Sequence, residues 1–194
     1  MPIKSDNWII EQCESNQMIH PYSREQVKKI ELPNGNSRKV ISYGVSSYGY
    51  DIRLGNTFRV LNAEQNIELD PKNVRPQLFR TVRADDYLVL PPHGLVLAQT
   101  IEYFKIPRDI LTICYGKSTY ARCGVLVNVT PFEPEWEGFA TISISNTSAC
   151  PVRLYAGEGI AQLIFLKADE VCAVSYADKG GKYQAQLEPT AAKV

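Results

Sequence analysis

From about residue 40 onward, short apolar runs alternate with turn-forming pieces. The strands that this pattern predicts are residues 39–43, 58–61, 87–90, 95–100, 110–114, 125–129, 140–145, 152–155 and 162–166. Turns are expected at residues 32–36, 91–94 and 157–159, which are rich in Gly, Pro and Asn. The segment Thr-Ile-Ser-Ile-Ser places Thr141, Ser143 and Ser145 on one face of a strand. Many short strands without a βαβ rhythm predict a mainly β fold, a barrel or a sandwich.

Residues 5–18 follow a helical pattern instead, with Trp8, Ile9 and Cys13 near one side and Ser5 or Asp6 as a cap. We therefore expect one short N-terminal helix and few other short helices. Gly and Pro are scattered rather than gathered into a linker, and the sequence has no internal repeat. Residues 1–194 are accordingly predicted to form a single domain.

The segment after Ala177 loses apolar periodicity and is rich in Gly, Lys and Gln. It suits either a frayed terminus or a mobile arm, about 177–194, that closes over a ligand. The side chains suited to contact a phosphate there are Lys179, Lys182, Tyr183, Gln184 and Gln186.

Charge and composition exclude several classes of partner. The 21 basic and 21 acidic residues cancel, which argues against a nonspecific nucleic-acid coat or a polybasic membrane anchor. No apolar run approaches the roughly 18 residues of a membrane span, and the start does not resemble a signal peptide. The five cysteines form no C-x-x-C pair, as is typical of a reducing cytoplasm. We expect a cytoplasmic protein.

Metal chemistry at the protein's own side chains has few candidate ligands. The histidines are His20 and His93, and neither belongs to the H-x-E and P-C-x-x-C pattern of zinc nucleoside deaminases. No zinc is therefore expected, and a histidine-based catalytic triad is poorly supported.

An anion-binding turn is predicted after the strand at 110–115. Gly116 is followed by Lys117, Ser118 and Thr119, and then by Arg122, so hydroxyls, cations and backbone N–H groups converge. The turn is not a Walker A loop, because Leu111 stands where that motif needs Gly. An ordinary capped turn is the alternative.

Several longer motifs carry a family resemblance over residues 3 to about 186. They are Gly116-Lys-Ser-Thr-Tyr-Ala-Arg-Cys-Gly124, Asn128-Val-Thr-Pro-Phe-Glu-Pro-Glu-Trp-Glu-Gly138, Ser46-Ser-Tyr-Gly-Tyr-Asp-Ile-Arg53, Ile101-Glu-Tyr-Phe-Lys-Ile-Pro107, Gly157-Glu-Gly-Ile-Ala-Gln162, Val174-Ser-Tyr-Ala-Asp178 and Gly181-Lys-Tyr-Gln-Ala-Gln186. In combination they resemble the bacterial dCTP deaminases.

The resemblance implies a distorted β-barrel of the dUTPase-like superfamily, assembled as a homotrimer with sites between subunits. It implies conversion of dCTP to dUTP and ammonia, with dCTP, dUTP or dTTP as ligands, and some relatives also cleave the triphosphate. It further implies Mg²⁺ that accompanies the triphosphate and takes no protein side chain as ligand.

The resemblance also implies site residues. Arg122 and Ser118 would position the substrate, Thr130 and the following turn would line the base pocket, and Trp136 would pack near the sugar. The full set is Lys117, Ser118, Thr119, Tyr120, Ala121, Arg122, Thr130, Trp136, Thr141, Ile142, Ser143, Gln162, Tyr176, Lys182 and Gln186. For Trp136 and Tyr176 simple packing is the alternative, and for Gln162 a polar position on a strand face.

One departure from the family bears on catalysis. The family strand has Glu where this chain has Ser143, between Gly138 and Asn146. Deamination without a metal needs a group that activates water and delivers protons, and losing such a group typically costs about a hundred- to ten-thousand-fold in rate.

Three explanations for Ser143 remain open. Another carboxylate, such as Glu133 or Glu135, could reach the base. The protein could bind nucleotide without deaminating it, as a diverged paralogue or variant. Alternatively it could hydrolyse dUTP, with Asp51 or Asp178 positioning water. Two smaller departures are the atypical sequence after Gln186 and Gln99, which stands where many relatives have Arg.

Overall fold

The computed structural model describes residues 2–62 and 68–193. The helices are α1 (Asp6–Asn16), the 3-10 helix η1 (Pro76–Leu78) and α2 (Ser118–Ala121). The strands are β1 (Ile19–His20), β2 (Val27–Glu31), β3 (Ser37–Ser46), β4 (Gly49–Leu61), β5 (Phe79–Arg83), β6 (Tyr87–Leu90), β7 (Leu95–Lys105), β8 (Ile110–Gly116), β9 (Val125–Asn128), β10 (Glu137–Asn146), β11 (Val152–Tyr155) and β12 (Gly159–Lys167). The expected mainly β class with one N-terminal helix is confirmed.

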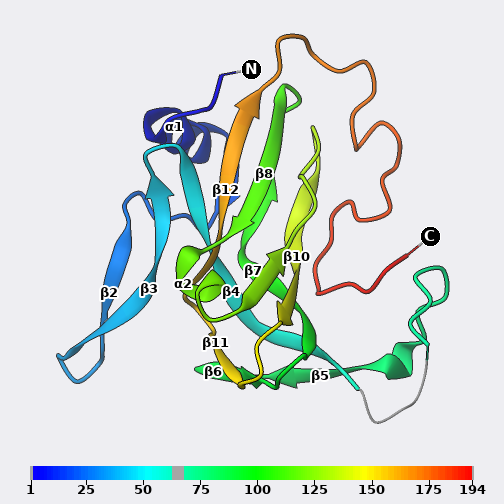
Figure 1. Cartoon of the computed structure of the whole chain (residues 1–194). Coiled ribbons are helices and arrows are strands. Elements are labelled where there is room, and N and C mark those ends of the chain that lie inside the picture. Colours follow the sequence, from blue (N-terminus) through cyan, green and yellow to red (C-terminus); the bar gives the residue numbers. More distant parts are fainter. Residues whose placement is uncertain (1, 63–67, 194) are drawn as a thin grey trace.

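The strands form one large antiparallel sheet that curves around the core (Figure 1). Its main path runs β2-β3-β4-β7-β10-β9, while β12 bridges β4 and β8. The strands β6 and β11 form a separate two-stranded ribbon. Among the described residues no ladder joins β8 to β9, so the expected barrel is not closed by hydrogen bonds.

The core lies inside this curved sheet, because alternate residues of its strands point inward. In β7 and β10 every second residue is buried, including Ala98, Phe104, Ile142 and Ile144. Burying such side chains contributes roughly 1.5–3 kcal/mol for each large apolar residue. The same alternation turns Thr141, Ser143 and Ser145 outward, as the sequence predicts.

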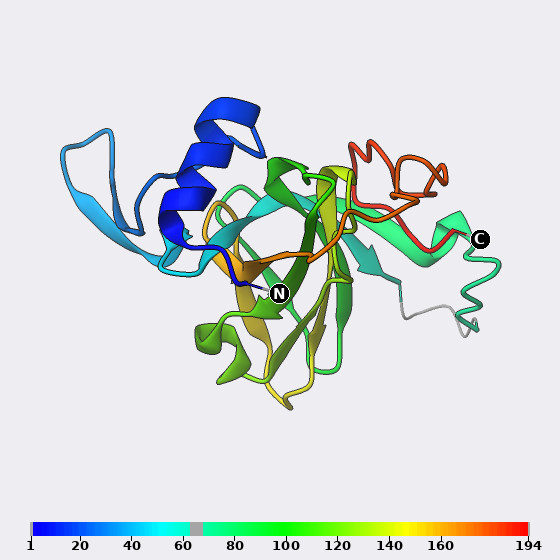
Figure 2. The same ribbon diagram turned by 90° about the horizontal axis from the view of Figure 1, so that it is seen from above.

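The N-terminal helix packs over one end of the sheet through its apolar side (Figure 2). Ile9 and Cys13 are buried, and the Trp8 ring lies 6.0 Å from the Phe165 ring. Burial raises the pKa of the Cys13 thiol to about 12. Ser5 occupies the N-cap position, but its side chain makes no capping hydrogen bond, so the expected cap is wrong in that respect.

Two segments extend beyond the body of the sheet. The β2–β3 hairpin projects from the body of the molecule, and its turn closes through the Gly35 N–H, which donates to the Leu32 carbonyl (Figure 1). The tail, residues 168–193, follows β12 and returns beside β10. It forms a parallel bridge between Gln186 and Gly138.

Candidate functional site

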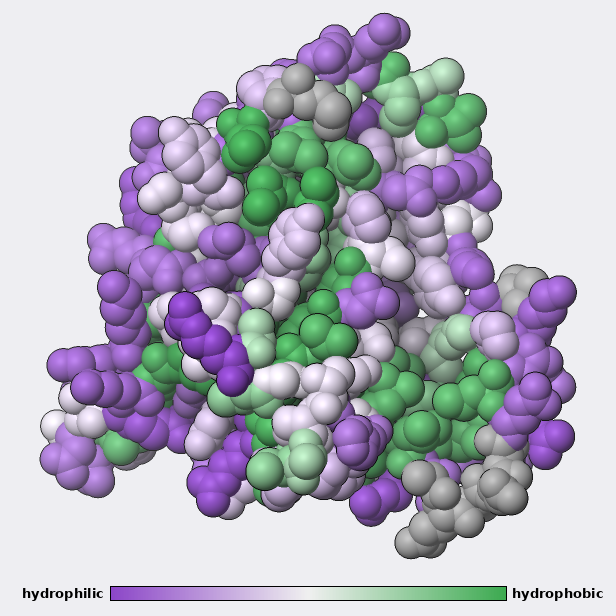
Figure 3. Space-filling view, in the orientation of Figure 1, coloured by the Kyte–Doolittle hydropathy of each residue, from purple (hydrophilic) through white to green (hydrophobic). Residues whose placement is uncertain are grey.

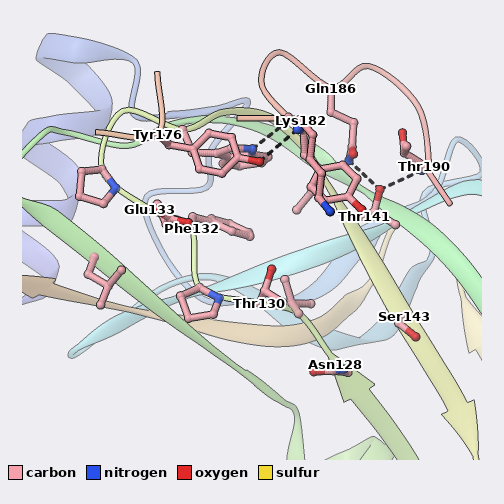
Figure 4. A pocket seen from close by; sticks show the side chains of 17 residues that line it. Asn128, Thr130, Phe132, Glu133, Thr141, Ser143, Tyr176, Lys182, Gln186 and Thr190 are labelled. Atoms are coloured by element: carbon pink, nitrogen blue, oxygen red, sulfur yellow. Dashed lines mark hydrogen bonds between the residues drawn. The ribbon is translucent and has the colours of Figure 1, made fainter. Parts of the chain in front are cut away.

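A cavity of about 790 Å³ lies on the outward face of β10, and we call it the main cavity. It is bounded by β10, by the loop that follows β9, and by the tail (Figure 4). Its lining residues are Leu111, Asn128, Val129, Thr130, Pro131, Phe132, Glu133, Pro134, Trp136, Ala140, Thr141, Ser143, Tyr176, Lys182, Tyr183, Gln186 and Thr190. This size is in the range of small-molecule sites.

The strands supply neutral hydrogen-bonding groups to this cavity. Ser143 on β10 pairs across the ladder with Asn128 on β9, so their side chains share one face of the sheet. Thr141 lies two residues away on the same face. The next residue, Ile142, is fully buried on the opposite face and is not among the described residues that line the main cavity.

An aromatic wall closes one side of the main cavity. The Phe132 and Trp136 rings lie 4.6 Å apart at 34°, and the Trp136 indole N–H donates to the Tyr183 carbonyl at 2.9 Å. The Tyr176 hydroxyl accepts a hydrogen bond from the Tyr183 backbone N–H at 3.0 Å. Trp136 and Tyr176 therefore hold the tail and line the cavity at once.

The tail is fixed to β10 through both main chain and side chain. The Ala185 N–H donates to the Glu137 carbonyl, and the Phe139 N–H donates to the Gln186 carbonyl. Gln186 Nε2 donates to Thr141 Oγ1 at 2.6 Å (Figure 4). Gly138, with φ of +142°, permits this approach, because a Cβ there would lie 2.8 Å from the Gln186 nitrogen.

Glu133 is the one carboxylate among the described residues that line the main cavity. Its Oε2 is paired with the Lys179 ammonium. Figure 4 shows Glu133 on the Tyr176 side of the cavity, away from Ser143. Glu133 therefore does not take the place of a carboxylate at Ser143.

A neighbouring ion-pair network fixes the start of the tail. Arg108 donates to Glu135 and to Asp178, each at 2.6 Å. The Arg108 hydrogen bond, followed by the Ser175 backbone N–H, lowers the pKa of Asp178 to about 2. Both Glu135 and Asp178 are thereby committed to structural contacts.

The turn after β8 forms as predicted, with the strand ending at Gly116 and α2 covering Ser118–Ala121. Lys117 Nζ lies 2.5 Å from Asp51 Oδ2, and both side chains are largely buried. Tyr120 is also buried, and its hydroxyl accepts the Tyr155 N–H at 3.0 Å. Burial raises the pKa of Tyr120 to about 12.

The turn does not line the main cavity of its own chain. Thr119, Tyr120 and Arg122 instead line a second cavity of about 630 Å³, together with Cys123 and Cys150. The predicted site residues that are not among the described lining of the main cavity are Lys117, Ser118, Thr119, Tyr120, Ala121, Arg122, Ile142 and Gln162. Those that the structure brings together there are Thr130, Trp136, Thr141, Ser143, Tyr176, Lys182 and Gln186.

Some predicted residues have structural partners, and some lining residues were missed. Gln162 Nε2 donates to Ser46 Oγ at 2.9 Å. Asn128 and Thr190 line the main cavity without having been assigned a role, and Tyr183, expected only as a possible phosphate contact of the tail, lines it as well. The alternation of β9 and β10 could have indicated Asn128, whereas the backbone contact of Thr190 with Thr141 Oγ1 leaves no local sequence signal.

Within residues 2–62 and 68–193, no three His, Cys, Asp or Glu side chains gather in a way that could hold a metal ion. None of the helices in the same ranges is long and apolar enough to span a bilayer.

The curved antiparallel sheet has the fold of a solved nucleotide deaminase. The crystal structure of the 2'-deoxycytidine 5'-triphosphate deaminase from Agrobacterium tumefaciens matches with a TM-score of 0.57 and 16% identity. The match covers 84% of this chain and 47% of that chain.

Residues 3–168 match the family model described as dCTP deaminase-like. The dCTP deaminase of Coxiella burnetii (strain Dugway 5J108-111) is 55% identical over 186 residues, 96% of each chain. The dCTP deaminases of Acidithiobacillus ferrooxidans (strain ATCC 53993 / BNL-5-31) and Acinetobacter baumannii (strain AYE) are 54% and 52% identical over the full length of both chains. This chain belongs to the dCTP deaminase-like family.

Proposed function

We propose that this chain is a dCTP deaminase, which hydrolyses the 4-amino group of dCTP to give dUTP and ammonia. The observation that carries the proposal is the main cavity, which offers hydroxyl and amide groups on its floor and an aromatic wall beside them. Curated dCTP deaminases at 52–55% identity support the same substrate.

The lining suggests how a cytosine would be held. Backbone carbonyls near Val129–Pro131 would receive the 4-amino group, and Thr130 would border the base. Trp136, fixed by its indole hydrogen bond, would pack against the sugar. These groups are held by strands and by the tail, so binding would need little reorganisation.

The chemical step depends on what stands beside the base. By its resemblance to the family strand, Ser143 would stand at the position of the family Glu. A serine hydroxyl orders water but is not basic near neutral pH. The reaction would therefore run about a hundred- to ten-thousand-fold slower than with a positioned carboxylate.

The separation of turn and cavity supports a site shared between copies of the chain. Ser118 and Arg122 would reach the phosphates of a nucleotide held in a neighbour's main cavity, because they do not line the main cavity of their own chain. A homotrimer would create three such sites.

The triphosphate would carry Mg²⁺ without side-chain ligands. Phosphate oxygens suit Mg²⁺, which keeps most of its water shell and often binds through substrate phosphates. When bound, the ion would neutralise phosphate charge, while Ser118 and Arg122 would orient the phosphates.

The second candidate is a nucleotide-binding protein without turnover. It is favoured by Ser143, together with the pairing of Glu133 to Lys179 away from Ser143. Hydrolysis of dUTP is less well supported, because both carboxylates considered for it are in ion pairs, Asp51 with Lys117 and Asp178 with Arg108.

One experiment separates the three functions. Calorimetry measures binding of dCTP and dUTP, while parallel assays measure ammonia from dCTP and pyrophosphate from dUTP. Ammonia release supports deamination. Tight binding with neither ammonia nor pyrophosphate release supports the nucleotide-binding protein without turnover. Release of pyrophosphate without ammonia supports dUTP hydrolysis.

A further inference from the structure

A third cavity, of about 810 Å³, lies between the β2–β3 hairpin and the turn that follows β8, and we call it the hairpin cavity. Lys28, Lys29, Arg38 and Lys39 line it from the hairpin, and Thr119 lines it from the turn. Among the described residues, the linings of the hairpin cavity and of the main cavity have no residue in common. It is therefore a separate site in which positive charge dominates.

Among the described lining residues the one acidic side chain, Glu158, is already engaged. Glu158 is 5% exposed, its Oε2 accepts the Ile41 N–H at 2.7 Å, and its Oε1 lies 3.4 Å from Arg38 Nη2. Arg38 also donates to Asp86 at 2.9 Å, yet its Nε is buried without a hydrogen-bond partner. Arg38 is therefore held in place by two carboxylates, and it adds a fixed positive charge to the cavity lining.

The surface of the β2–β3 hairpin is mostly hydrophilic (Figure 3). In residues 2–62 and 68–193 no ion pair involves Lys28, Lys29 or Lys39. Lys29 and Lys39 are direct cross-strand partners on β2 and β3. Like charges directly opposite each other destabilise a strand pair. An anion bound between them would turn that repulsion into attraction for both.

We propose that the hairpin cavity binds a small polyphosphate anion, of the kind carried by a nucleoside triphosphate or by inorganic tripolyphosphate. Lysine ammonium groups bind phosphate oxygens as point charges. Three lysines without an ion-pair partner in the described part of the chain suit an anion with several phosphates. The cavity volume is in the range of small-ligand sites. An extended nucleic acid fits less well, because the whole chain has no net charge to attract it.

The test is calorimetric titration of the full chain, first saturated with dCTP, with sodium tripolyphosphate. The site predicts one additional anion per chain. Lys29→Gln/Lys39→Gln should weaken this binding by about tenfold or more. The control Lys72→Gln/Lys105→Gln removes the same charge from exposed positions elsewhere and should leave it within about twofold.

A second measurement does not depend on any variant. Tripolyphosphate should slow amide hydrogen exchange in residues 27–31 and 37–42 and leave residues 176–190 unchanged. If ATP binds about as tightly as tripolyphosphate, the phosphate chain is the group that the cavity recognises. If ATP binds more tightly, the natural ligand is a nucleotide.

Several outcomes would overturn the proposal. They are absence of tripolyphosphate binding, equal loss in both double variants, and tighter binding of short single-stranded DNA than of tripolyphosphate. The site stands independently of the proposed function. If dCTP fails to bind, the same titration measures tripolyphosphate binding to the hairpin cavity of the free protein.

Discussion

Ser143 on β10 and Asn128 on β9 face each other across the ladder and both line the main cavity. This pair gives the cavity a floor that donates and accepts hydrogen bonds but carries no charge. Such a floor can hold a base and a water molecule, while proton transfer needs a group that titrates nearer to neutral pH. Recognition and chemistry are therefore separable in this chain.

Restoring a carboxylate at this position tests that separation. Ser143→Glu should raise kcat for ammonia release from dCTP by about a hundred- to ten-thousand-fold, because the carboxylate would activate water next to the base. The control Ser145→Glu adds the same group on the same face of β10 and should not raise kcat. Equal rates for Ser143→Glu and the unaltered chain would show that more than the base has been lost.

Gly138→Ala should release the tail from β10. The added methyl group would lie 2.8 Å from the Gln186 nitrogen, at a φ of +142° that favours glycine. Limited proteolysis should then cut residues 177–193 faster. Gly157→Ala is the matched control, because its φ is also positive, at +78°, but its added methyl group would contact nothing. Faster cleavage of this tail segment in both variants would mean that general destabilisation exposes the tail, and not the loss of its contact with β10.

The contact between Asp178 and Arg108 predicts a pH dependence. The pKa of Asp178 in the folded chain, about 2, lies below the unfolded value, so its contribution to stability is present above about pH 4. It is lost as the pH falls toward about 2. Asp178→Asn should lower the melting temperature at neutral pH, and the difference from the unaltered chain should vanish near pH 2. A difference that persists at that pH would contradict the assignment.

Breaking the ion pair between Asp51 and Lys117 should be costly. Asp51→Asn would leave a largely buried ammonium without its partner, which destabilises a protein by about 3–5 kcal/mol. Urea denaturation measures the change. Asp109→Asn breaks a more exposed pair with Lys167 and should cost about 1 kcal/mol or less. A loss for Asp51→Asn as small as that of the control would mean that Lys117 reaches water.

The sequence pattern predicted the strands whose apolar residues alternate regularly, and it missed those held by distant partners. β7 and β10 were predicted because every second residue faces the core. The first half of β4 was missed, because the buried carboxylate of Asp51 is explained only by Lys117, which is 66 residues away. The short strands β1, β2 and β5 have too few residues facing the core to show a period.

The candidate site was predictable in part for the same reason. Alternation alone places Thr141 and Ser143 on one face of β10 and the side chain of Ile142 on the other, so the period of the strand separates Ile142 from the two residues that line the main cavity. The contact of Thr190 with Thr141 could not be foreseen, because it joins an aperiodic tail to a strand 49 residues earlier.

The tail is held against β10 largely by main-chain groups. The Ala185 N–H and the Gln186 carbonyl both form hydrogen bonds with the backbone of this strand. Nearly every residue offers these same groups, so many side chains of the tail can change without loss of the contacts. The unusual continuation after Gln186 adds one contact of the same kind, because the Thr190 N–H donates to Thr141 Oγ1. Exchanging side chains there, with any residue but proline at position 190, should therefore leave the tail beside β10.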